Sequence, residues 1–202
     1  MRALRILISV LVLVLTAGSA WALEQNELAF APQGGYARLT GNLGDLFADD
    51  FAYGAAFAYG ITDIFGVESD FLYSAHEAED KTETGNLTLT HFVAGLGPRI
   101  NWPTQYVAPY LAVLGGAALM KYKARWQTAD EESHQDNTGA HAFGGMLSAG
   151  IDAFISQGVT LGIGGRAGYF NSSFRYNAKG IRDQAAGSYA YYAGVVRVSL
   201  LF

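Results

Sequence analysis

Hydrophobic and polar residues alternate with a period of two along most of this chain. The last eleven residues show the pattern most clearly, because their even-numbered positions are all apolar, small or aromatic: Tyr192, Gly194, Val196, Val198, Leu200 and Phe202. The positions between them include Arg197 and Ser199. Period-two alternation predicts a β-strand with two different faces. A strand that excludes charge from one face and places an arginine on the other is typical of a wall between lipid and a polar interior.

Eight segments of the chain carry strand patterns. Their limits, by residue number, are 28–39, 51–62, 65 to about 76, about 87–101, 107 to about 123, 141–154, 159 to about 170 and about 188–202. The first segment is the weakest, because Pro32 and the pair Gly34–Gly35 interrupt it. In the fifth segment both faces are apolar or small, so the pattern leaves its inward face undecided.

The connections between these segments alternate in length, with short ones near residues 62, 102 and 157 and long ones near 45, 80, 131 and 178. Transmembrane barrels have this arrangement of short turns and longer surface loops. After residue 22 no apolar run reaches the length of a membrane helix, so a membrane location requires a closed barrel. A soluble β-sandwich or lipocalin-like barrel is the alternative, but it would need charges along its whole polar face. The pattern therefore predicts an all-β fold, an eight-stranded antiparallel transmembrane β-barrel with up-and-down meander connections.

The N-terminus has the features of a secretory signal peptide. Arg2 and Arg5 precede an apolar run over residues 6–16, and Ala20-Trp21-Ala22 fits a cleavage site. We therefore expect residues 1–22 to be a cleaved signal and residues 23–202 to form one barrel domain with a net charge of −7. This acidic balance and export from the cytoplasm argue against nucleic-acid binding. The chain has no cysteine, which excludes disulfides and thiolate metal sites.

These features together resemble one family. The signal, the alternating segments, the motif G-L-G-P-R-I-N-W-P at 95–103 and the terminal Phe202 are similar to small outer-membrane β-barrel proteins, especially the transmembrane domain of outer membrane protein A and its short relatives. The resemblance implies the bacterial outer membrane, reached through the periplasm. It also implies outer-membrane lipids, lipopolysaccharide, periplasmic chaperones and the barrel-assembly machinery as partners. Tyr192, Gly194 and Phe202 would carry the assembly signal.

Charged residues share the predicted inner face of the barrel. They are Glu68, Asp70, Arg99, Asp152, Arg166 and Arg197, with Arg38 as a further candidate. Because an isolated buried charge costs several kcal/mol, these groups must pair. The pairs would form either a plug that fills the lumen or the selectivity lining of a narrow pore. An eight-stranded barrel is only just wide enough to be filled by side chains, which favours the plug.

Two surface features could bind partners. Lys121, Lys123 and Arg125 recur at every second position, so they lie on one face of the fifth segment. If that face points outward, they could contact lipopolysaccharide phosphates; if it points inward, they pair with the acidic loops. The long connections near 45, 80 and 131 hold most of the acidic residues, which could bind an extracellular ligand.

Catalysis has little support in the sequence. A lipid A deacylase would need a serine beside a histidine, and none of His76, His91, His134 and His141 has a serine two positions later. The one suggestive pair is His76 with Ser74, which share a strand face. We therefore predict no enzyme, no cofactor and no metal site. The predicted function is a structural or surface-interaction role with a plugged lumen. A narrow porin-like channel for ions or small solutes is the alternative, and a lipid-modifying enzyme ranks third.

Overall fold

The computed structural model describes residues 25–41, 43–44, 46–78, 86–127, 133–178 and 181–202. Within these ranges the side chains of residues 86–87, 124–127, 133–138, 172–178 and 181–186 are not described. The predicted signal peptide, residues 1–22, lies outside the described residues and stays a prediction.

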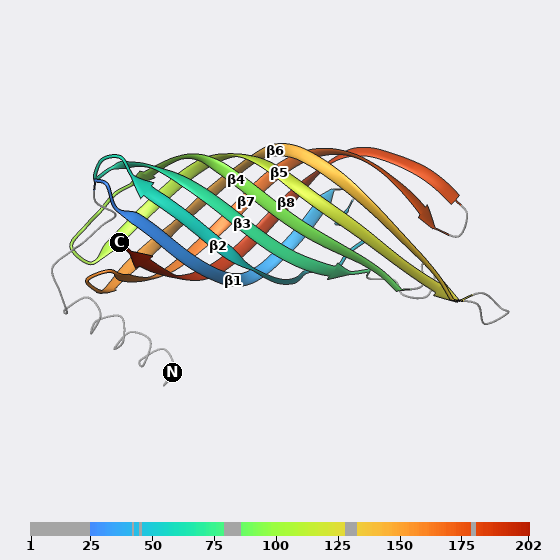
Figure 1. Cartoon of the computed structure of the whole chain (residues 1–202), viewed down its shortest axis with the longest axis horizontal. Helices are drawn as coiled ribbons and strands as arrows, with labels where there is room; N and C mark the ends of the chain where they lie inside the picture. Colours follow the sequence, from blue (N-terminus) through green and yellow to red (C-terminus); the bar gives the residue numbers. More distant parts are fainter. Residues whose placement is uncertain (1–24, 42, 45, 79–85, 128–132, 179–180) are drawn as a thin grey trace, which may run out of the picture.

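The described part of the chain forms eight strands: β1 (Leu28–Gly41), β2 (Asp50–Gly60), β3 (Phe65–Glu77), β4 (Asn86–Asn101), β5 (Val107–Gln127), β6 (Ser133–Ser156), β7 (Val159–Ala178) and β8 (Ile181–Leu201). Each strand pairs antiparallel with the next, and β8 pairs with β1 to close the barrel (Figure 1). Closure leaves no free sheet edge around the barrel. This confirms the predicted fold class and meander. No helix in the described residues is long and apolar enough to cross a membrane.

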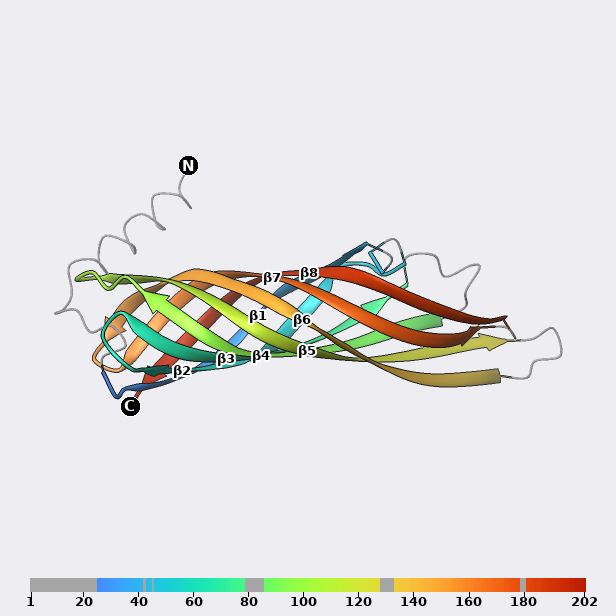
Figure 2. The ribbon, with the colours of Figure 1, turned by 90° about the horizontal axis from the view of Figure 1, so that it is seen from above.

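The two ends of the barrel differ. The short connections at residues 61–64, 102–106 and 157–158 lie at the same end as Phe202, and we refer to this as the turn end. At the opposite, loop end, β5 to β8 extend beyond the other strands (Figures 1 and 2). Pairing of β6 with β7 stops at Ala142 and Ser172, whereas β5–β6 and β7–β8 stay paired to their tips. The two hairpins therefore continue past the rim as separate ribbons.

Alternation sets the two faces of the wall. In β2 the aromatic residues, such as Phe51 and Tyr53, are exposed on the outside, and Ala52, Ala56 and Ala58 are buried inside. The small inner face of β2 leaves room for long side chains from other strands. In β5, whose faces the sequence left undecided, the even-numbered residues point inward and are buried: Ala108, Tyr110, Ala112, Leu114, Ala118, Met120 and Tyr122.

The predicted limits of three strands were wrong at the loop end. β6 begins at Ser133 and not near residue 141, β7 continues to residue 178, and β8 begins at residue 181. Their polar composition indicated loops, but a hairpin satisfies its backbone hydrogen bonds whatever its side chains are. The polar residues in these parts of β6, β7 and β8 indicate contact with water and not the absence of a strand.

The first strand is continuous, although its sequence contains breakers. β1 passes through Pro32 without ending, and its pairing with β8 skips Ala31 and Pro32. Proline has no N–H to donate, so a local gap in one ladder accommodates it. Further along, a Cβ at Gly35 would lie 1.8 Å from the carbonyl oxygen of Gly194. Glycine at position 35 therefore permits the close approach of β1 and β8.

Candidate functional site

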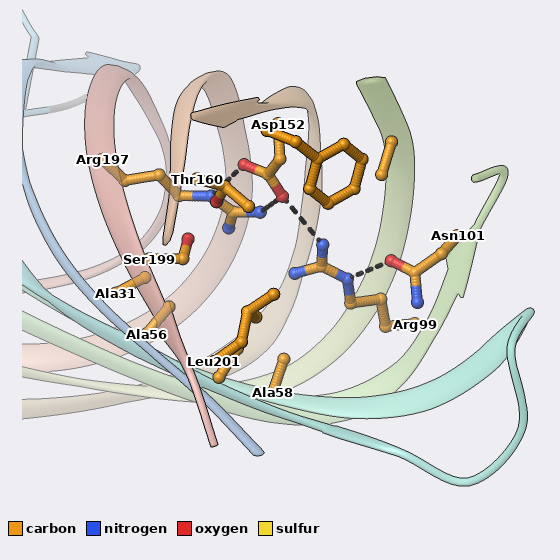
Figure 3. Close-up of a pocket in the computed structure, with 13 residues that line it drawn as sticks. Ala31, Ala56, Ala58, Arg99, Asn101, Asp152, Thr160, Arg197, Ser199 and Leu201 are labelled. Atoms are coloured by element: carbon orange, nitrogen blue, oxygen red, sulfur yellow. Dashed lines mark hydrogen bonds and ion pairs between the residues drawn. The ribbon is translucent and has the colours of Figure 1, made fainter. Parts of the chain in front are cut away.

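An ion-pair cluster occupies the lumen toward the turn end. Arg197 of β8 holds Asp152 of β6 at two points, with Nε–Oδ1 at 2.8 Å and Nη2–Oδ2 at 2.5 Å. Arg99 of β4 donates from Nη2 to the same Asp152 Oδ2 at 3.2 Å and from Nη1 to Oε2 of Glu68 at 2.5 Å. Figure 3 shows both guanidinium groups directed at the Asp152 carboxylate. The cluster thus ties four strands together across the lumen.

A second group lies beside this cluster and includes the remaining two predicted charges. Arg166 of β7 donates from Nε to the Asp70 carboxylate of β3. Gln33 of β1 joins both, since its Nε2 donates to Asp70 Oδ1 at 2.6 Å and its Oε1 accepts from Arg166 Nη2 at 2.7 Å. All three side chains are buried. Three carboxylates and three guanidinium groups therefore lie inside the barrel, and their formal charges balance.

Neutral residues that the sequence reasoning missed complete the charged layer. The guanidinium carbons of Arg99 and Arg197 lie 4.1 and 4.0 Å from the centroid of the Tyr110 ring, which is close enough for cation–π attraction. Ser148 donates to Glu68 Oε1 at 3.1 Å, and Asn101 accepts from Arg99 Nε at 2.6 Å. The sequence did not indicate Tyr110, because both faces of the fifth strand are apolar or small and the inward one could not be identified.

Arg38 does not join the cluster, contrary to the expectation. It points outward from β1, and its Nε lies 3.7 Å from Oδ1 of Asp49 on the exposed surface. Strand parity is the reason: the inward positions of β1 include Gln33, Ala37 and Leu39, which are buried. The neutral Gln33 takes the inner place in β1.

A small cavity of about 30 Å³ lies between the charged layer and the turn end. Five of its thirteen lining residues are alanines, which come from β1, β2 and β5 (Figure 3). Within the described part of the chain, Asn101 Nδ2, Thr160 Oγ1 and Arg197 Nη1 are buried without a hydrogen-bond partner, and all three residues line this cavity. A cavity of this size has room for one or two water molecules. Among the described residues, no group of three or more His, Asp or Glu side chains could hold a metal ion.

The lumen toward the loop end is filled by a second, apolar layer. Its members are mutually packed and buried, and include Leu39, Leu72, Leu89, Leu114, Met120, Met146, Phe170, Tyr189 and Val195. Leu43 and Phe47, from the connection between β1 and β2, are buried in the same layer. Phe47 packs on the Tyr122 ring at a centroid distance of 6.2 Å. The β1–β2 connection therefore folds inward over the lumen, which no periodicity in that connection indicated.

Two of the four histidines lie inside this part of the lumen. His76 Nε2 is 2.8 Å from Ser74 Oγ, and its Nδ1 is 2.9 Å from the carbonyl oxygen of Ala48. Because a carbonyl only accepts, Nδ1 carries the proton, and a neutral ring then accepts the Ser74 hydroxyl at Nε2. This orientation could serve proton transfer, but both side chains are buried. His91 Nε2 lies 2.9 Å from the hydroxyl of Tyr189.

The remaining predicted residues lie on the outside. Lys121 and Lys123 are exposed on the outer face of β5, and Arg125 shares their strand parity but its side chain lies outside the described residues. Tyr192 and Gly194 are exposed on the outer face of β8 beside β1, and Phe202 is exposed at the turn end. Most of the acidic residues in the long connections also lie outside the described residues, as does the side chain of His134; His141 is exposed on β6.

Comparisons with known proteins agree with this geometry. The family model described as "outer membrane protein beta-barrel domain" matches residues 8–192. The fold is similar to the outer membrane protein OprG from Pseudomonas aeruginosa, with a TM-score of 0.58 and 12% identity over 90% of this chain and 99% of that one. It is also similar to the outer membrane protein AlkL in lipid bilayers, with a TM-score of 0.52 and 13% identity over 92% of this chain and 94% of AlkL. No curated protein matches.

A third similar structure is Ail, the attachment invasion locus protein of Yersinia pestis, in complex with the heparin analogue sucrose octasulfate. The TM-score is 0.51 with 12% identity, over 88% of this chain and 99% of Ail. Identities this low show a shared fold only. The closed eight-stranded barrel and the matching family model together confirm the resemblance and the outer-membrane location inferred from the sequence. The chain belongs to the outer membrane protein beta-barrel domain family.

Proposed function

We propose that this protein is a plugged outer-membrane barrel with a structural or surface-interaction role, and that it does not conduct ions or solutes. The observation that carries the proposal is the double filling of the lumen. The charged layer crosses the barrel from Arg99 on β4 to Arg197 on β8, and the apolar layer lies between it and the loop end. An eight-stranded barrel is narrow enough for side chains alone to fill it.

The pairing within the charged layer supports a plug over a selectivity lining. A channel attracts ions with unpaired charges of one sign around its pore. Here each carboxylate in the layer contacts at least one guanidinium, and Asp152 contacts two. A permeating ion would have to separate these pairs. Each buried ion left without its partner would cost several kcal/mol.

The loop end supports a surface-interaction role. The β5–β6 and β7–β8 hairpins extend beyond the rim, and in outer-membrane barrels the end opposite the short turns faces the exterior. Eleven of the eighteen acidic residues lie in the connections near 45, 80 and 131 or on the strand ends beside them: Asp45, Asp49, Asp50, Glu77, Glu79, Asp80, Glu83, Asp130, Glu131, Glu132 and Asp136. A cationic extracellular ligand would suit this surface better than a polyanion such as the one bound by Ail.

The outward face of β5 supports a contact with lipopolysaccharide. Lys121 and Lys123 point away from the lumen, so they are free to reach phosphate groups at the membrane surface. Replacing Lys121, Lys123 and Arg125 together by glutamate should weaken association with lipopolysaccharide vesicles in a flotation assay. If a correctly folded triple variant associated with the vesicles as the wild type does, the proposed contact would be contradicted.

We infer no enzymatic role. Ser74 and His76 are enclosed by the lumen wall and by the β1–β2 connection, so they do not face the outer surface of the barrel, where a lipid ester would lie. The test is mass analysis of lipid A from cells that express the protein or lack it. Identical lipid A species in both are expected, and a product that depends on Ser74 would contradict the inference.

Planar-bilayer recording of the purified, refolded protein tests the main proposal. We expect no steady unitary current in salt solution at moderate voltage. A larger outer-membrane porin, recorded in the same bilayers, controls for detection. Steady unitary currents from the folded protein would overturn the plugged lumen and favour the narrow channel.

A further inference from the structure

A groove of about 440 Å³ lies on the outer wall where β1 meets β8. Tyr36 and Arg38 of β1, Tyr192 and Gly194 of β8, and Asp49, which precedes β2, are among the residues that line it. The four strand residues have the outward parity of their strands, and all five residues are exposed. Gly194 forms part of the floor, and a Cβ built on it would meet no atom within 4 Å. The groove therefore exists partly because position 194 has no side chain.

The surrounding residues place the groove at the edge of the hydrocarbon layer. From Gly194 toward the turn end, the outer positions of β8 are Val196, Val198 and Leu200, all apolar. In the other direction the groove reaches Tyr192 and Tyr36, and Tyr36 packs edge-on against Phe51 at 5.9 Å. Aromatic girdles of this kind mark the two membrane interfaces of a barrel.

Charged groups begin directly beyond these aromatic rings, at Arg38 and Asp49. An exposed arginine on the outer wall is tolerated near the interface but costs several kcal/mol at the bilayer centre. Tyr36 and Arg38 belong to the half of β1 nearer the loop end, the end that faces the exterior in outer-membrane barrels. One end of the groove therefore lies against the acyl chains of the outer leaflet, and the other end lies at a cationic group among the lipid headgroups.

Arg38 is suited to bind a phosphate there. Its Nε lies 3.7 Å from Asp49 Oδ1, a loose ion pair. A guanidinium has five N–H donors in a planar fork, so one contact of this length leaves most of them available. Arginine pairs with phosphate through two parallel hydrogen bonds, and Asp49 would hold the group in position for them.

We propose that this groove is a binding site for lipid A of lipopolysaccharide, with one acyl chain lying over Gly194 between Tyr36 and Tyr192 and a phosphate on Arg38. The outer leaflet supplies this lipid at the depth of the groove. The site is separate from the contact proposed for Lys121 and Lys123 on β5. It goes beyond the proposed function, which places lipopolysaccharide phosphates at Lys121 and Lys123 and assigns no lipid to the seam between β1 and β8.

Two variants test the groove directly. Gly194→Leu fills the floor without meeting any atom at Cβ, so the barrel should still form. Arg38→Gln removes the charge. Gly165→Leu is the matched control, because Gly165 is paired with Gly194 on the neighbouring strand, has its nearest neighbour 4.0 Å from an added Cβ and does not line the groove. A Lys121→Gln/Lys123→Gln variant separates this site from the contact on β5.

The proteins are refolded in vitro, checked by heat-modifiable gel mobility and incorporated into bilayers with lipid A, dephosphorylated lipid A or phosphatidylglycerol. Native mass spectrometry after release into mild detergent then counts retained lipid. With the contact on β5 removed by Lys121→Gln/Lys123→Gln, we expect one lipid A on the protein with the native groove and on Gly165→Leu, about tenfold less on Arg38→Gln, and loss on Gly194→Leu.

Three outcomes would overturn the site. These are equal retention of lipid A by the wild type and folded Arg38→Gln, equal retention by Gly194→Leu, and equal retention of dephosphorylated lipid A or phosphatidylglycerol by the wild type. If Gly194→Leu does not fold, Arg38→Gln and the lipid series still decide the question.

Discussion

Asp152 accepts two arginines on one oxygen: Oδ2 lies 2.5 Å from Nη2 of Arg197 and 3.2 Å from Nη2 of Arg99. Glu68 provides the other carboxylate of this cluster, at 2.5 Å from Arg99 Nη1 and 3.8 Å from Arg197 Nη1. The two acids and two arginines thus form a ring in which each member has two partners. Removing any one of them leaves an uncompensated charge inside the barrel.

Asp152→Asn should therefore lower the free energy of unfolding by about 3–5 kcal/mol, the range found when one partner of a buried ion pair is removed. Urea unfolding of the protein in lipid vesicles, followed by tryptophan fluorescence, measures the change. Asp49→Asn is the matched control: it breaks an exposed pair with Arg38, so the expected loss is below about 1 kcal/mol. Equal stabilities of the two variants would contradict a ring that depends on Asp152.

The two layers of the lumen predict that opening one of them is not enough for conduction. In Asp152→Ala/Arg197→Ala the charged layer loses its central pair, but Leu114, Met120 and Phe170 still fill the lumen toward the loop end. We expect this variant to show no steady unitary current in planar bilayers. Adding Phe170→Ala and Phe47→Ala should produce currents, provided the variant still folds.

Phe170→Ala/Phe47→Ala with an intact charged layer is the companion control and should remain closed. Currents from a variant in which only one layer is disrupted would mean that this layer closes the barrel without help from the other.

The sequence predicted the charged layer better than the apolar one. A lipid-facing wall excludes charge, so a charged residue of the opposite parity on a predicted strand must point into the lumen. This argument identified Glu68 and Arg197. It failed for Arg38, which lies where the outer face already meets the headgroups and can carry charge. Gln33 was missed because a neutral amide gives no such signal, although it hydrogen-bonds both Asp70 and Arg166.

The apolar layer could not be predicted for a different reason. Leu43 and Phe47 belong to a connection, where no alternation marks an inward side, and only the folded chain places them in the lumen. The strand limits at the loop end failed for a related reason. Backbone pairing extends as far as the pairs Gln127–Ser133 and Ala178–Ile181, through stretches rich in polar residues, so hydrophobicity marks the membrane boundary and not the strand end.

The β1–β2 connection should depend on His76 for its closed position. His76 Nδ1 donates to the Ala48 carbonyl at 2.9 Å, and Ala48 N donates to Glu77 O at 2.9 Å. His76→Ala removes the first bond and leaves a gap beside it. We expect hydrogen exchange at the Ala48 amide to become about tenfold faster, which corresponds to losing one hydrogen bond of ordinary strength.

Ser74→Ala keeps the bond from His76 to Ala48, so it should change exchange at Ala48 less than His76→Ala does. His141→Ala, at an exposed position on β6, controls for the loss of a histidine. Equal exchange at Ala48 in the wild type and His76→Ala would show that the connection is held without the bond from His76.

Phe202 should matter for assembly in the cell and not for the stability of the finished barrel. Its backbone closes the seam, with Phe202 N donating to Leu28 O at 2.9 Å and Leu28 N donating to Phe202 O at 3.1 Å, and these bonds need no side chain. Phe202 as a residue is 72% exposed, so Phe202→Ala removes little packing within the protein. We expect this variant to refold in detergent with wild-type stability but to accumulate in the outer membrane several-fold less in cells. Leu200→Ala, two positions earlier on the same face, is the matched control and should assemble normally. Normal cellular assembly of Phe202→Ala would remove Phe202 from the assembly signal, whereas failure of both refolding and assembly would make its role structural.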